Sequence, residues 1–297
     1  MRSLLMYELA NDELKVSIAK KGAELSSIID KKTGREYVWT ANPQYWNRHA
    51  PILFPLVGSV WNGEYHVDGA LYKLGQHGFA RDREFDFIGI EGNKASFKLS
   101  SNDETKALFP FDFVLKVVYE LNGKVLRVHW IVENPSDKTL YFQVGGHPGF
   151  NYPDFKPEDE IHGYFKMNTN HLNYKLIGSK GCLDVDHSYT FDAGNDGYYP
   201  INPHLFDKDA LVIENSQVTS ITLCDKEKKP YITMKYDAPV TGIWSPTNKN
   251  APFVCIEPWY GRCDRVEFKG DYSQKDWINK LDAHKVFETS YTIEVEY

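Results

Sequence analysis

Apolar and polar residues alternate with a period of two along much of the chain. Every second residue between positions 113 and 121 is apolar, and a second alternating segment covers residues 126–132. Asn122 and Gly123 lie between the two segments, and this dipeptide tolerates the positive φ angles of a tight turn. Because successive side chains of a strand point to opposite faces, the pattern predicts a β-hairpin.

Similar patterns predict strands along the whole length. They occur at residues 84–90, 95–100, 140–144, 220–224, 231–236, 252–256 and 289–297. One helix is predicted over residues 273–286, where Trp277 and Leu281 have a helical i, i+4 spacing. Short strands with closely spaced turns predict an all-β fold, a large antiparallel β-sandwich with few short helices. No low-complexity segment or Pro/Gly/Ser-rich linker divides the chain, so we expect a single domain over residues 1–297.

Composition and charge exclude several classes of protein. The chain has 297 residues, with 34 basic against 41 acidic side chains and a formal net charge of −7. Nucleic-acid binding needs clustered basic residues, which this balance disfavours. No segment approaches the ~20 apolar residues that span a bilayer, and Glu8 interrupts the start too early for a secretory signal. We therefore expect a cytoplasmic protein that binds neither nucleic acid nor membrane.

The cysteines fit this expectation. They are Cys182, Cys224, Cys255 and Cys263, which form no C-x-x-C pair and have no zinc-like spacing. A chain of this length buries enough surface to fold without disulfides or a structural metal. We expect four reduced cysteines.

Three segments interrupt the alternation with glycine, proline, histidine and acidic residues. They are residues 74–82, 143–151 and 255–261, and a fourth, residues 47–55, is apolar and proline-rich but begins with basic residues. Glycine lets the backbone approach a ligand closely, and loops at strand ends often carry function. These segments are the candidates for chemistry.

His147 is preceded by Gly145 and Gly146 and followed by Pro148 and Gly149. It should project from the end of the strand predicted before it, where Pro148 stops the pairing. The alternative is a buried histidine that bonds to backbone. The flanking glycines and proline favour a functional role.

Glu257 stands between the apolar residues Ile256 and Pro258, after a segment that predicts a buried strand. A carboxylate in such a place is costly unless it is paired or used. Burial would raise its pKa and make it a stronger base. The alternative is a structural ion pair with Arg262 or Arg265.

His77 and Arg81 belong to the first segment. The alternative to a functional role for them is a surface turn with a solvated Arg81–Asp82 pair. Hydrolase, P-loop and dinucleotide-binding motifs are absent from the sequence. His77, His147 and Glu257 could bind zinc, but no H-x-H or H-x-x-x-H pair supports this. We expect neither a metal nor a cofactor.

Together these segments resemble the aldose 1-epimerase (galactose mutarotase-like) family, and within it the LacX-type members. The resemblance rests on QHGFARD at 76–82, GGHPGFN at 145–151 and CIEPWYG at 255–261, and it extends over nearly the full chain. It implies a galactose mutarotase-like supersandwich that interconverts the α and β anomers of an aldose without a cofactor. The partner would be a small sugar or sugar phosphate.

The same resemblance implies roles for individual residues. Glu257 would be the base that takes the proton from the anomeric O1, and His147 the acid that protonates ring O5, so that the ring opens and recloses after rotation about C1–C2. His77 would position the acid or the ring oxygen. The implied substrate-binding residues are Arg48, Gln76, Arg81, Asp209 and Trp259, with Asp192 and Asp196 as alternatives to Asp209. Trp259, Phe79 and Trp244 are candidates for an aromatic platform under the sugar, and core packing is the alternative for each.

One departure from the family pattern concerns an arginine that galactose mutarotases carry soon after a glycine. Here Ser59 follows Gly58, so Arg48 is expected to take its place. Three other functions remain open: a hexose-6-phosphate 1-epimerase, a non-catalytic carbohydrate-binding or sensing protein, and a glycoside hydrolase. The first would be favoured if Arg48 and Arg81 converge at one end of the cleft. The last is disfavoured because only Glu257 has the context of a catalytic carboxylate. The sequence predicts neither the sugar nor the oligomeric state.

Overall fold

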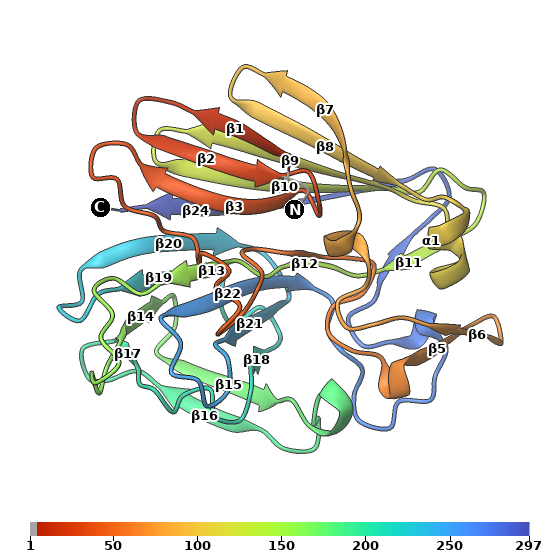
Figure 1. Ribbon diagram of the computed structural model, residues 1–297. Coiled ribbons are helices and arrows are strands. Elements are labelled where there is room, and N and C mark those ends of the chain that lie inside the picture. Colours follow the sequence, from red (N-terminus) through yellow and green to blue (C-terminus); the bar gives the residue numbers. More distant parts are fainter. Residues whose placement is uncertain (1–4, 297) are drawn as a thin grey trace.

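The computed structural model describes residues 5–296, and its regular secondary structure consists mainly of antiparallel strands (Figure 1). The predicted all-β architecture is confirmed. Buried side chains from the two largest sheets join one hydrophobic cluster, which includes Val117 and Ile293 from one sheet and Val254 and Ile256 from the other. The two sheets therefore form the layers of a sandwich.

Nine strands form the larger sheet, in the spatial order β17 (Tyr199–Ile201), β14 (Gly163–Met167), β19 (Ser220–Cys224), β20 (Pro230–Tyr236), β24 (Val286–Val295), β10 (Val125–Glu133), β9 (Val114–Asn122), β8 (Lys94–Ser100) and β7 (Asp86–Glu91). The eight-stranded sheet has the order β16 (Tyr189–Asp192), β15 (His171–Leu176), β18 (Leu211–Ile213), β21 (Val240–Trp244), β22 (Phe253–Tyr260), β12 (Val144–Gly146) and β4 (Ile52–Leu53), and β13 (Gly149–Asn151) also pairs with β22.

Smaller elements complete the fold. A three-stranded sheet consists of β1 (Met6–Ala10), β2 (Leu14–Ala19) and β3 (Glu24–Asp30), and two-stranded pairs join β5 (Glu64–Val67) to β6 (Ala70–Lys73) and β11 (Leu140–Phe142) to β23 (Asn279–Leu281). Helical structure is limited to α1 (Asp103–Leu108) and the 3₁₀ turns Trp61–Gly63, Ala80–Asp82, Ser179–Gly181 and Tyr272–Gln274 in the described part of the chain. No helix among residues 5–296 is long and apolar enough to cross a membrane.

The predicted hairpins are confirmed. In the β9–β10 hairpin Asn122 pairs with Val125, so the turn consists of Gly123 and Lys124, one residue later than predicted. Gly123 has a φ of 53° there, as a tight turn requires. The hairpins β7–β8 and β19–β20 and the C-terminal strand β24 also match their predicted segments, while Tyr297 lies outside the described residues.

The helix predicted over residues 273–286 is wrong. The segment contains a 3₁₀ turn and β23, and β24 starts at its last residue. Tertiary hydrogen bonds hold this chain in place: Trp277, with a φ of 58°, donates from Nε1 to Glu214 at 2.7 Å, and Asn279 donates to the carbonyls of Phe142 and Tyr260. The helix that does form, α1, begins at a capping box between Asn102 and Thr105.

The register of β12 and β13 against β22 positions the central residues of the site. Gly145 pairs with Trp259 and Gly149 pairs with Cys255, so one register continues through both short strands. The break between the strands contains His147, which this register places opposite Glu257. The strand that was predicted to end before Pro148 is thus interrupted at His147 and Pro148, and pairing with β22 resumes at Gly149.

Candidate active site

A cavity of about 320 Å³ contains most of the residues that the sequence singled out. It is lined by Trp46, Gly58, Gln76, His77, Arg81, His147, Ile177, Gly181, Asp209, Ala210, Trp244, Glu257, Trp259 and Cys263. Of the eight predicted site residues, only Arg48 is not among these lining residues.

His147 and Glu257 meet at one wall of this cavity. The Nε2 atom of His147 lies 3.3 Å from the Oε2 atom of Glu257, and the two residues are 8% and 1% exposed. The other polar atom of each group, Nδ1 of His147 and Oε1 of Glu257, is buried without a hydrogen-bond partner among residues 5–296. Buried polar groups are nearly always bonded, so these two atoms are available for a ligand.

Burial drives the pKa values of the pair in opposite directions. It raises the pKa of the Glu257 carboxyl well above its ordinary value, against the opposing effect of a hydrogen bond from Trp259. Burial, together with the positive charges of Arg81 and Arg48, lowers the pKa of His147 to about 3. A proton shared by the pair is therefore held by the carboxyl in preference to the imidazole.

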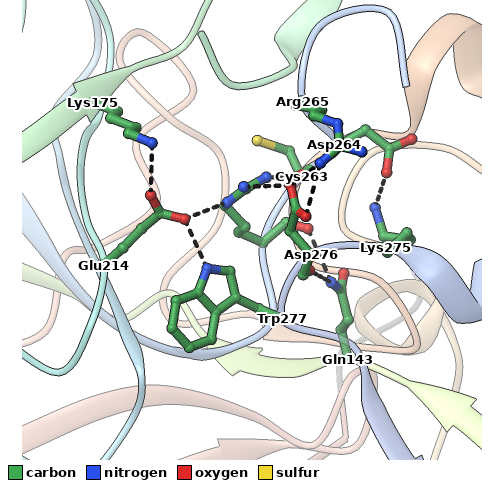
Figure 2. A network of polar contacts seen from close by, with 10 residues as sticks. Gln143, Lys175, Glu214, Cys263, Asp264, Arg265, Lys275, Asp276 and Trp277 are labelled. Carbon is green, nitrogen blue, oxygen red and sulfur yellow. Dashed lines mark hydrogen bonds and ion pairs between the residues drawn. The ribbon is translucent and has the colours of Figure 1, made fainter. Parts of the chain in front are cut away.

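The predicted alternative for Glu257, an ion pair with Arg262 or Arg265, is wrong. Arg262 donates to Glu214 and Asp276 at 2.7 Å each, and Arg265 donates to Asp276 (Figure 2). This network fixes the chain just after β22, because Arg262 follows that strand by two residues.

Gln143 extends the same network toward the cavity. Its Nε2 donates to the carbonyl of Arg262 and its Oε1 accepts from the backbone of Val57, next to Gly58 of the cavity wall. Gly58 has a φ of 70°, and a Cβ there would lie 2.5 Å from Cys263. The glycine of the family pattern is therefore needed for close packing, whatever side chain follows it.

His77 is held as a neutral hydrogen-bond donor. Its Nδ1 accepts from the backbone N–H of Gly58 at 3.1 Å, so its own proton is assigned to Nε2. Burial lowers the pKa of His77 well below its ordinary value, with His147, Arg81 and Arg48 adding to the effect. Its ring centroid lies 5.6 Å from that of His147.

Three cations meet at Asp82 near the cavity. Nη2 of Arg48 lies 3.0 Å from this carboxylate, Nε of Arg81 lies 3.7 Å away and Nζ of Lys21 lies 3.8 Å away. The Arg81–Asp82 pair of the surface-turn alternative is therefore present, but the Arg81 side chain is only 18% exposed and lines the cavity. Arg81 also donates to the carbonyl of Gln76 at 2.7 Å.

Trp259 forms a wall that also orients the carboxyl. Its Nε1 donates to Oε2 of Glu257 at 3.2 Å. Its ring is fixed between Gly145 and Gly242, where an added Cβ would come within 2.9 and 2.5 Å of ring atoms. Phe79, a further candidate for the sugar platform, instead packs in the core.

Trp46 is a cavity residue that the sequence analysis missed. Its ring stacks on His147 with centroids 4.7 Å apart, and Trp244 meets the same imidazole edge-on at 5.3 Å. Trp46 lies just before the fourth segment noted in the sequence, in a loop with no strand pattern to indicate its direction. Only the tertiary structure brings it to the cavity.

Among the three aspartates considered for substrate binding, Asp209 is the one that lines the cavity. Asp192 pairs with His171, and Asp196 pairs with Lys228. Asp209 has a φ of 75°. Its negative charge contributes to the raised pKa of Glu257.

The chain is similar to known proteins both in sequence and in structure. A sequence model of the family described as Aldose 1-epimerase matches residues 6–269. The plasmid form of protein LacX from Lactococcus lactis subsp. lactis is 32% identical over 98% of this chain and 99% of its own. The crystal structure of a galactose mutarotase related enzyme from Lactobacillus acidophilus is 36% identical with a TM-score of 0.91, covering 99% of this chain and 98% of that one. A galactose mutarotase-like protein from Lactobacillus casei ATCC 334 is 32% identical with a TM-score of 0.89, covering 98% and 100%. The chain belongs to the aldose 1-epimerase family.

Proposed function

We propose that this protein is an aldose 1-epimerase that interconverts the α and β anomers of a hexose, with Glu257 as the base and His147 as the acid. One observation carries the proposal: the two groups lie 3.3 Å apart in one cavity, and each has a buried polar atom without a partner. Mutarotation needs a proton removed at O1 and another delivered to O5. A carboxyl and an imidazole that face the same sugar can perform both transfers.

Glu257 and His147 alone accept and supply the protons that the reaction requires. The Glu257 carboxylate takes the O1 proton, the C1–O1 bond becomes a carbonyl, and the electrons of the breaking C1–O5 bond move to O5. O5 takes its proton from the His147 imidazolium, which leaves an open-chain aldehyde. Rotation about C1–C2 followed by the reverse transfers gives the other anomer.

The proton count of the pair supports this sequence of steps. The pair starts as carboxylate and imidazolium and ends as carboxylic acid and imidazole, with one proton in total throughout. Burial favours the second distribution, since it raises the pKa of Glu257 and lowers that of His147. The cavity thus favours the ring-opened state, and hydrogen bonds from bound substrate must stabilise the charged pair before opening.

The surrounding residues are assigned to binding and orientation. His77 donates from Nε2 to a ring or hydroxyl oxygen, and Trp259 holds the carboxyl of Glu257 in place through its 3.2 Å bond. Asp209 accepts hydrogen bonds from sugar hydroxyls. Gln76 and Arg81 contribute hydrogen-bond donors from the segment that also contains His77.

A second candidate is the same reaction on a hexose 6-phosphate. Arg48 and Arg81 converge on Asp82, and Lys21 joins them, so one carboxylate faces three cations at this end of the cavity. An excess of positive charge is suited to a phosphate, which arginine binds in a bidentate manner.

Polarimetry or NMR of freshly dissolved α-glucose, α-galactose and their 6-phosphates tests both candidates. We expect faster approach to anomeric equilibrium in the presence of the protein. Tight binding without acceleration of any of these sugars would instead indicate a carbohydrate-binding protein.

A further inference from the structure

Cys255 lies beside His147 and Glu257, and the proposed reaction does not use its thiol. It lies two residues before Glu257 on β22, so both side chains point to the same face of the strand. The register places His147 opposite Glu257 and Gly149 opposite Cys255. One ligand atom from each of the three residues lies within 4.8 Å of the other two, and all three residues are buried.

We propose that His147, Cys255 and Glu257 form a binding site for one soft divalent cation, such as Zn²⁺ or Cd²⁺. Thiolate, imidazole and carboxylate are the ligands of protein zinc sites, and the thiolate selects against Mg²⁺ and Ca²⁺. Three protein ligands leave a fourth position open for water, which suits a site beside a cavity. The 4.8 Å limit is wider than the spacing in an occupied site, so binding draws the three side chains inward.

The unpartnered atoms provide independent support. Nδ1 of His147 and Oε1 of Glu257 have no hydrogen-bond partner within residues 5–296, although both residues are more than nine-tenths buried. A buried carboxyl oxygen such as Oε1 of Glu257 is costly without a partner, and a cation would satisfy it. Both residues line the 320 Å³ cavity, which gives an ion access to the site. Asp209, which lines the same cavity, places a further negative charge on this side of the cavity.

Occupancy of this site has a consequence for the proposed reaction, and this step rests on the proposed function. A bound ion takes the lone pairs that His147 and Glu257 need for proton transfer. Zn²⁺ would therefore inhibit mutarotation, and a chelator would restore it. Binding itself does not depend on the protein being an epimerase.

Titration with Cd²⁺ tests binding directly, through the ultraviolet charge-transfer band of a cadmium–thiolate bond. We expect one Cd²⁺ per chain with this band in the wild type and in Cys263→Ala, which removes a thiol that lines the cavity but is not one of the three ligands. The band should be lost in Cys255→Ala. A wild type without the band, or an equal band in Cys255→Ala, would overturn the proposal.

Two further measurements examine the ligand role of Glu257 and the effect of the ion on the reaction. Glu257→Gln keeps the thiol and should weaken Cd²⁺ binding by at least about tenfold, a loss that even outer-shell partners of a metal can cause. Unchanged affinity in this variant would contradict the site, whether or not Cys255→Ala folds. Zn²⁺ inhibition is then compared with the metal-free rate of each variant, and equal inhibition of wild type and Cys255→Ala would overturn the blocking role. A Cd²⁺ band in a protein without mutarotase activity would support the metal site and refute the proposed function.

Discussion

Nε2 of His147 lies 3.3 Å from Oε2 of Glu257, and burial moves the pKa values of the two groups in opposite directions. A proton shared by the two groups is therefore held more tightly by the carboxyl than by the imidazole. The same pair can thus serve the forward and the reverse transfer. The short distance between the two groups depends on β12 and β13, which share one register against β22.

Glu257→Gln and His147→Asn should each reduce anomer interconversion by at least about a hundredfold, because each removes one of the two proton-transfer groups. The rate is measured by polarimetry on the sugar that the wild type converts fastest. His129 and Glu120 form a comparable contact of 3.1 Å on β10 and β9, outside the cavity. His129→Asn and Glu120→Gln are therefore matched controls that should retain the activity, and an equal loss in them would contradict the assignment.

Glu257→Gln should also make the protein more stable at neutral pH. The folded-state pKa of Glu257 lies well above its ordinary value of 4.5, so the folded state loses stability as the pH rises above 4.5, where only the unfolded chain releases the proton. Glutamine does not titrate, and the variant should unfold a few degrees higher at pH 7. Thermal unfolding at pH 7 and pH 4 measures this difference. A gain of the same size at pH 4 would show that the carboxyl ionisation is not its cause.

The strands and hairpins were predictable because local patterns determine them. Alternation and turn residues lie within a few positions of one another, as in the β9–β10 hairpin. The predicted helix at 273–286 failed because bonds to distant residues hold that segment, among them the contact between Trp277 and Glu214. Two residues at helical spacing are weaker evidence than a capping box, and the helix α1 has one at Asn102.

The cavity was predictable only as far as motifs identify its residues. The segments around His77, His147 and Glu257 stand out through their glycines and prolines. Trp46 carries no such signal, since its contact with His147 depends on how a loop folds over the sheet. Phe79 and Trp259 both belong to segments that the motifs mark, and only packing separates the core residue Phe79 from the cavity wall at Trp259.

Gly242→Ala should lower kcat by about tenfold to a hundredfold. The added Cβ would lie 2.5 Å from the ring of Trp259, which must move and lose its bond to Glu257, and a hydrogen bond to a charged group contributes about 1.5–3 kcal/mol. Trp259→Phe removes the donor but keeps a ring and should have a similar effect on kcat. Gly75→Ala is the control, because a Cβ at Gly75 meets no atom within 4 Å. Full activity in Trp259→Phe would contradict a role for this hydrogen bond.

Arg48→Ala should discriminate between the two substrate classes. If the cations around Asp82 bind a phosphate, the variant should lose about tenfold to a hundredfold in kcat/KM for a hexose 6-phosphate and much less for the free hexose, because only the former loses a charge-assisted bond. Added salt should also reduce the preference of the wild type for the phosphorylated sugar, because salt screens the attraction between the cations and the phosphate. Arg127→Ala, on β10 and outside the cavity lining, is the matched control for the loss of a positive charge. Equal losses for both sugars in Arg48→Ala would indicate that Arg48 supports the cavity without recognising phosphate.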